Sequence, residues 1–72
     1  MKTKYKFIYF EMLYDEYWSI YNNRTKNLLG EIKYYKKWKE FELYLERDVA
    51  FTKECLLDVV NFMDQLKATE QV

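Results

Sequence analysis

Hydrophobic and polar residues alternate along the first two thirds of the chain with the period of two that is typical of β-strands. The clearest case is a short segment in which Phe41, Leu43 and Leu45 share one face, with Glu or Tyr between them. A strand with one apolar and one polar face packs on a core with the first and meets water with the second. We therefore predict a half-buried strand over about residues 40–46.

Three earlier segments carry the same strand signal, because they are rich in β-branched and aromatic residues and polar residues separate them. They span about residues 5–13, 16–22 and 28–35. In the first segment both alternating faces are apolar, which favours a strand that is central in its sheet or covered on two sides. Gly30, the only glycine, lies inside the third segment and indicates a β-bulge or a close backbone approach.

The hydrophobic period lengthens to between three and four in the last third of the chain, which is typical of an amphipathic helix. The apolar residues form one stripe: Cys55, Leu56, Val59, Val60, Phe62, Met63 and Leu66. Thr52 stands just before the stripe, where its hydroxyl can cap the first turn. The pattern predicts a helix over about residues 53–67.

Four strands followed by one helix predict an α+β fold, in which the helix packs across one face of an antiparallel sheet of about four strands. The 72 residues suffice for a single domain, residues 1–72. We expect one core, built from the apolar face of the sheet and the helix stripe. Its expected members are Ile32, Tyr34, Phe41, Leu43, Leu45, Cys55, Val59, Phe62, Met63 and Leu66.

The chain has no His and one Cys, so it lacks the residues that most zinc sites and nucleophilic triads require. Glu40, Glu42 and Glu46 alternate along a strand face exposed to water, which does not supply the two different environments that an acid–base pair of carboxylates requires. Cys55 lies on the apolar stripe, which predicts a buried structural thiol. We predict a protein that is not an enzyme and uses no catalytic residue, cofactor, metal ion or small-molecule substrate.

No apolar run approaches the roughly 18 to 20 residues that a membrane span requires. A single thiol cannot form an internal disulfide, which fits a reducing compartment. We therefore expect a cytoplasmic protein that does not associate with a membrane.

The net charge of zero conceals an asymmetry along the chain. Residues 1–39 hold nine Lys and Arg against four acids, whereas residues 40–72 hold three against eight. If the basic loops at 24–26 and 36–39 converge, they form a cationic patch beside Tyr and Trp rings, which is the composition that binds single-stranded nucleic acid. The other interpretation is that the glutamates of residues 40–46 neutralise these lysines across the hairpin.

Eight Tyr, two Trp and five Phe are more than a core of this size can bury, so some of them must be exposed. Exposed Tyr and Trp dominate the energetics of protein interfaces. We expect Trp38, in a Lys-rich turn, to be more exposed than Trp18, which alternates with Ile20 as a core residue. The candidate partner-binding residues gather on one predicted hairpin: Trp38, Tyr35, Tyr44, Lys37 and Lys39.

The chain also carries an ordered set of short motifs. They are Trp18 with Asn22-Asn23, Leu29-Gly30-Glu31-Ile32, Tyr35 with Trp38, and Cys55-Leu56-Leu57-Asp58. This order resembles small uncharacterised proteins of bacteria and their phages with a Trp-Asn-Asn, Leu-Gly-Glu-Ile, aromatic-Trp, Cys-Leu-x-Asp pattern. The resemblance spans about residues 17–67, and its motifs are structural.

Mobile elements often carry small proteins of this kind, and some such proteins bind host defence machinery, as anti-CRISPR proteins do. The resemblance carries no activity of its own, and the role that we predict in its context is that of a phage or mobile-element protein that binds and inhibits host defence machinery in the host-cell cytoplasm. We predict a protein-interaction module whose partner is a host protein or a second copy of the chain, as a homodimer. The alternative is a small single-stranded nucleic-acid-binding protein.

Overall fold

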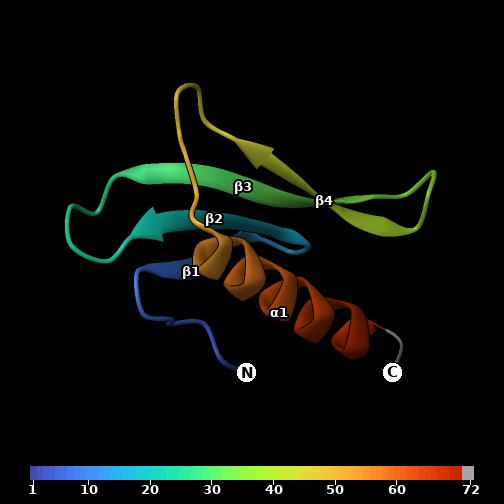
Figure 1. The fold of residues 1–72 in the computed structure, drawn as a ribbon. Helices are drawn as coiled ribbons and strands as arrows, with labels where there is room; N and C mark the ends of the chain where they lie inside the picture. The colour runs from blue at the N-terminus through green and yellow to red at the C-terminus, as the bar shows by residue number, and fades with distance from the viewer. Residues whose placement is uncertain (71–72) are drawn as a thin grey trace.

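The computed structural model describes residues 1–70 and has the predicted α+β fold (Figure 1). The strands are β1 (Ile8–Tyr14), β2 (Tyr17–Asn22), β3 (Leu28–Tyr35) and β4 (Glu40–Leu45), and the helix is α1 (Lys53–Glu70). The predicted segments agree with these bounds to within about three residues. Within residues 1–70, no helix has both the length and the apolar composition needed to cross a membrane.

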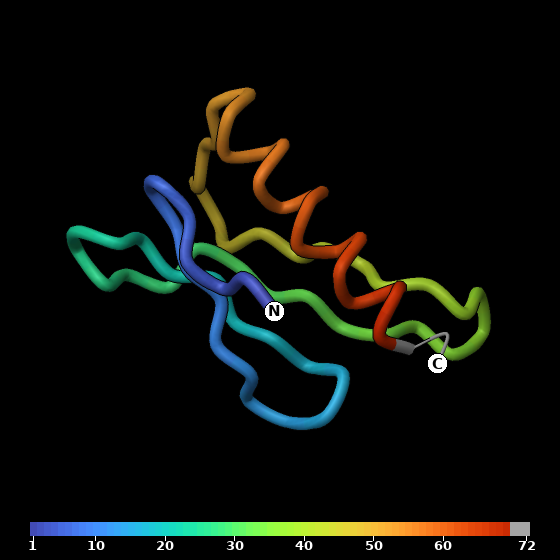
Figure 2. The backbone as a smooth tube through the Cα atoms, turned by 90° about the horizontal axis from the view of Figure 1, so that it is seen from below, coloured from blue at the N-terminus to red at the C-terminus, as the bar shows by residue number. Residues whose placement is uncertain are grey.

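The sheet is an antiparallel meander with the order β1-β2-β3-β4, and α1 crosses one of its faces (Figures 1 and 2). We call the face away from α1 the outer face. The order places β1 at an edge, so the prediction of a central first strand is wrong. The alternative of a strand covered on two sides is also wrong for its second half, where Met12 and Leu13 are 58% and 52% exposed. Part of the missing cover comes from the N-terminal segment, because Lys4 bridges to Tyr9 and the Phe10 N–H donates to the Thr3 carbonyl at 2.8 Å.

The core lies between α1 and the apolar face of the sheet. Its buried residues are Tyr5, Ile8, Phe10, Ile20, Ile32, Cys55, Val59, Phe62 and Leu66. Five expected core residues are therefore confirmed as buried: Ile32, Cys55, Val59, Phe62 and Leu66. Four more are half-buried: Tyr34, Phe41, Leu43 and Met63. Leu45 is 44% exposed, contrary to expectation, because it ends a strand at the sheet edge.

The role predicted for Gly30 is confirmed. The pairing of β2 with β3 shifts register beside it, since Ile20 pairs with Gly30 whereas Tyr21 pairs with Leu28. A Cβ atom at Gly30 would lie 2.5 Å from the backbone oxygen of Tyr44. Glycine is therefore needed for the close approach of β3 and β4, although its φ is not positive.

The predicted helix cap is also confirmed. The N–H of Cys55 donates to the side-chain oxygen of Thr52 at 3.2 Å, and the N–H of Leu56 donates to the Thr52 carbonyl at 3.0 Å. The first bond satisfies one of the donors that a helix leaves open at its start, and the second is the first regular hydrogen bond of the helix. At its other end the helix extends to Glu70, three residues beyond the predicted end.

Candidate functional site

The turn between β3 and β4 carries the most exposed tryptophan of the chain. We call Tyr35, Lys36, Lys37, Trp38 and Lys39 the hairpin tip. Trp38 is 67% exposed, and its ring makes an edge-to-face contact with Tyr35, with centroids 5.4 Å apart. The hairpin tip therefore presents an aromatic pair among three lysines.

Local backbone geometry explains why Trp38 projects from the sheet. The N–H of Lys39 bonds to the carbonyl of Lys36 at 3.3 Å, which closes a tight turn around Trp38. Lys39 has a φ of 54°, in the left-handed region that costs a residue other than glycine about 1 to 2 kcal/mol. The turn leaves Trp38 outside the strand pairing.

The expected order of tryptophan burial is confirmed. Trp18 is half-buried and packs on the core, where it meets the ring of Phe62 edge-on at 4.9 Å. Trp38 has no such contact with the core. The two tryptophans therefore differ in role, since Trp18 supports the fold and Trp38 forms surface.

Tyr44 lies apart from the hairpin tip, on the outer face of β4. It pairs in register with Glu31, and its hydroxyl donates to Glu42 at 2.5 Å. This hydrogen bond is the main reason why the pKa of Tyr44 is raised, and Tyr35 contributes a smaller effect. The five predicted site residues therefore divide into four at the hairpin tip and Tyr44 on the neighbouring sheet surface.

Carboxylates on the outer face serve as hydrogen-bond acceptors for tyrosines. The hydroxyl of Tyr17 donates to Glu31 at 2.5 Å, and the Lys33 ammonium lies 3.7 Å from the same carboxylate. That ammonium also lies 4.8 Å from the centre of the Tyr17 ring. The hydrogen bond to Glu31 is the main cause of the raised pKa of Tyr17. These side chains form a neutralised polar surface at the centre of the sheet.

The two basic loops do not converge, so the condition for a combined cationic patch is not met. Loop 23–27 and turn 36–39 lie at opposite ends of β3 (Figure 1). The eight residues of β3 separate them by about 26 Å. The two loops therefore belong to separate surfaces.

Loop 23–27 instead packs on the N-terminal segment. The side-chain amide of Asn23 donates to the carbonyl oxygens of Tyr5 and Lys6, at 2.8 and 3.0 Å. This contact brings Lys4 and Lys6 to the same end of the sheet as the loop, which sequence reasoning missed. The available signal was the alternation of lysines before the first strand, combined with the antiparallel pairing of the first two strands.

The remaining candidate residues are the cysteine and the carboxylates. Cys55 is buried, as its place on the apolar stripe predicts. Within residues 1–70, no three His, Cys, Asp or Glu side chains gather closely enough to hold a metal ion. Glu40 forms an ion pair with Lys67 at 3.0 Å, which ties β4 to the end of α1.

Comparisons with protein families, curated proteins and solved structures find no match to this chain. We therefore infer the function from the surfaces described above.

Proposed function

We propose that this chain is a non-catalytic protein-interaction module that binds its partner through the hairpin tip. The observation that carries the proposal is the exposure of Trp38, at 67%, on a turn outside the core. A large aromatic side chain that is exposed to water contributes a large free energy of binding when a partner's pocket covers it. Tryptophan is enriched among the residues that dominate binding energies.

The contact with Tyr35 supports Trp38 as the anchor of this interface. The two rings meet edge-to-face at 5.4 Å, which restricts the side-chain freedom of Trp38 before binding. A side chain that is already ordered loses less entropy when a partner immobilises it. Tyr44 extends the contact surface along β4.

The charges of the hairpin tip define the chemistry of the partner. Among the side chains of residues 1–69, the ion pairs involve Lys33 and Lys67, so Lys37 and Lys39 have no carboxylate of these residues within ion-pairing distance. A complementary surface has an apolar pocket for Trp38 with Asp or Glu around its rim. Such rim charges accelerate association and select the partner.

The resemblance to small phage and bacterial proteins extends the proposal to a biological role. In this role the partner is a component of host defence, and the chain inhibits it by covering an acidic, apolar surface, in the manner of anti-CRISPR proteins. The inhibitor would act in the cytoplasm of the host cell and needs no cofactor.

A pull-down from bacterial lysate tests the proposal, with tagged wild-type protein compared with Trp38→Ala. Tyr14→Ala is the matched control, because Tyr14 is 68% exposed and also contacts a neighbouring tyrosine edge-to-face. We expect one protein to be retained by the wild type and by the control. Trp38→Ala should weaken the binding of the retained protein by at least about 30-fold.

A charge-reversal variant tests the predicted acidity of the partner surface, and circular dichroism checks that the variants are folded. Reversing the charges with Lys37→Glu and Lys39→Glu should slow association, most strongly at low salt, because the partner surface is acidic. Circular dichroism must show that each variant is folded. Equal retention of the protein by wild type and a folded Trp38→Ala variant would refute binding through the hairpin tip.

A further inference from the structure

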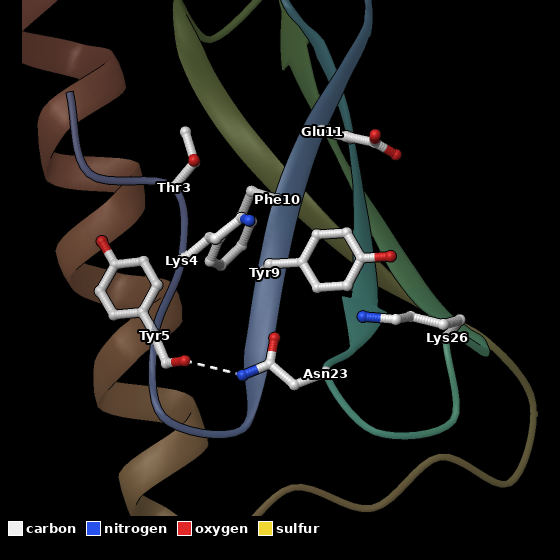
Figure 3. A pocket seen from close by; sticks show the side chains of 8 residues that line it. All are labelled: Thr3, Lys4, Tyr5, Tyr9, Phe10, Glu11, Asn23 and Lys26. Carbon is white, nitrogen blue, oxygen red and sulfur yellow. Dashed lines mark hydrogen bonds between the residues drawn. The ribbon is translucent and has the colours of Figure 1, made fainter.

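A second distinctive surface lies at the opposite end of the sheet from the hairpin tip. Two shallow cavities of about 540 and 340 Å³ adjoin at Asn23, which lines both. Lys4, Tyr9 and Lys26 line the larger cavity, shown in Figure 3. Lys6, Phe7 and Arg24 line the smaller one. We call these four cations and two aromatic residues the basic end.

Hydrogen bonds that span the length of the chain hold the basic end in place. The backbone N–H of Asn23 donates to the Phe7 carbonyl at 2.9 Å, in addition to the side-chain bonds of Asn23 described above. Tyr5, between Lys4 and Lys6, donates its hydroxyl proton to Asn61 of α1 at 2.7 Å. The cations therefore project from a backbone that is tied to both β2 and α1.

The cations of the basic end form no ion pair with the carboxylates that the structure describes. In the part of the chain that the structure describes, ion pairs are formed by Lys33 and Lys67, both outside this surface. Glu11 is the one acidic residue that lines either cavity. Four cations against one carboxylate give this end a positive potential that attracts polyanions.

Aromatic rings lie directly beside these cations. The Lys26 ammonium is 5.0 Å from the centre of the Tyr9 ring, and the Lys6 ammonium is 5.2 Å from the centre of the Phe7 ring. Phe7 is 44% exposed, and Tyr9 stacks on Tyr21 with centroids 5.3 Å apart. Each ring therefore offers apolar area next to a site for a phosphate.

We propose that the basic end binds a single strand of nucleic acid. The phosphates would contact Lys4, Lys6, Arg24 and Lys26, and bases would stack against the rings of Phe7 and Tyr9. Proteins that bind single strands without sequence preference combine these two elements, a positive surface and aromatic rings. An acidic peptide would use the cations and leave the exposed ring of Phe7 without a stacking partner. This site is independent of the proposed protein-binding function, because the hairpin tip lies at the other end of β3.

Fluorescence anisotropy with labelled 12-nucleotide oligo-dT and oligo-U tests the inference on the full chain. Four phosphate contacts predict that a plot of log affinity against log salt concentration has a slope of about −3. We expect Lys4→Gln/Lys26→Gln to reduce both the affinity and this slope. The control is Lys36→Gln/Lys37→Gln, which removes the same charge at the hairpin tip and should leave the affinity nearly unchanged.

Stacking is tested separately with Phe7→Ala, which removes a ring that is 44% exposed. The loss of one stacked base predicts an affinity about 5- to 100-fold lower. An abasic oligonucleotide of the same length should bind more weakly than oligo-dT and should not respond to Phe7→Ala. Trp38→Ala should leave oligonucleotide binding unchanged.

Several outcomes would overturn the inference. Equal losses in the two double variants would mean that only net charge matters. Equal binding of the abasic strand, or equally effective competition by polyglutamate, would mean that the surface attracts any polyanion. No binding of either oligonucleotide at low salt would also overturn it, and would leave the proposal for the hairpin tip untouched.

Discussion

The ring of Phe10 in β1 stacks on the ring of Phe62 in α1, with centroids 4.0 Å apart and an angle of 7° between the ring planes. Trp18 of β2 meets the same Phe62 ring edge-on at 4.9 Å. Phe62 is completely buried. One helix residue therefore joins α1 to both an edge strand and its neighbour.

We expect Phe62→Ala to unfold the domain. Truncating a buried Phe costs about 3 to 5 kcal/mol, which is comparable with the whole stability of a domain this small. Urea and thermal denaturation followed by circular dichroism measure the effect. Val60→Ala is the control, because Val60 lies on the same helix, is 53% exposed and should change stability by less than about 1 kcal/mol. A cooperatively folded Phe62→Ala variant with unchanged melting would contradict this assignment of the core.

The two tryptophans should respond differently to substitution. Trp18→Ala removes a ring that packs on Phe62, so it should destabilise the domain by about 3 to 5 kcal/mol or unfold it. Trp38→Ala removes a ring that is 67% exposed and should cost less than about 1 kcal/mol. Denaturant titrations of the two variants give the comparison directly. Unfolding by Trp38→Ala but not by Trp18→Ala would reverse the assignment of inside and outside.

Gly30→Ala should destabilise the sheet although it adds a single methyl group. The new Cβ would lie 2.5 Å from the Tyr44 backbone oxygen and 3.2 Å from the Cα of Leu45, so β3 and β4 would have to separate. Overpacking of this kind costs about 1 to 3 kcal/mol. Thermal melting measures the loss, and Ala50→Gly at an exposed loop position provides a comparison. Melting of Gly30→Ala at the wild-type temperature would contradict the close approach.

The hydrogen bond from Tyr17 to Glu31 should be visible in an alkaline titration. This bond raises the pKa of Tyr17 above the usual 10.0, because the folded state favours the protonated phenol. Its contribution to stability is therefore present below the unfolded pKa, about 10, and is lost as the pH rises through the folded pKa.

Ultraviolet absorbance of tyrosinate measures this ionisation. We expect Glu31→Gln to move one tyrosine to an earlier ionisation, and Tyr17→Phe to remove that same late step. Tyr44→Phe is the matched comparison, since the pKa of Tyr44 is raised by its own bond to Glu42. Identical titration curves for wild type and Glu31→Gln would contradict the effect of the hydrogen bond.

Self-association also remains a prediction, now with a defined surface. The bridge and the backbone hydrogen bonds described between the N-terminal segment and β1 lie in the first half of the strand, at Ile8, Tyr9 and Phe10. Met12 and Leu13, in the second half of this edge strand, are 58% and 52% exposed. Light scattering should give a mass above the 9.1 kDa of one chain, and Leu13→Lys should restore the monomer. A monomeric wild type at all accessible concentrations would refute the homodimer.

The strands and the helix could be predicted from the sequence because their signals are local. The alternation of Phe41 and Leu43 with glutamates identifies a strand without knowledge of its neighbours, and the stripe from Cys55 to Leu66 likewise identifies a helix. The exposure of Trp38 could also be predicted from the sequence, since its lysine neighbours favour a turn in water.

Burial at the edges of the fold could not be predicted in this way. Tyr5 is buried because its hydroxyl bonds to Asn61 and Gln65, more than 50 residues along the chain. Leu45 has the alternation of a core residue and is nevertheless exposed, because β4 has a neighbour on one side only. Periodicity shows which residues lie on the same face of a strand, but it contains no information about the order of the strands in the sheet.

The candidate surfaces also combine features that the sequence predicts with features that only the fold decides. The amino-acid sequence by itself determined the elements, the apolar face of each and the aromatic, lysine-rich composition of the hairpin tip. Only the tertiary structure separated loop 23–27 from turn 36–39, placed Lys6 on the same cavity as Arg24, and placed Lys4 on the same cavity as Lys26. The physical reason is that a surface patch depends on which strand ends are adjacent, and long-range backbone pairing and packing against α1 decide that adjacency.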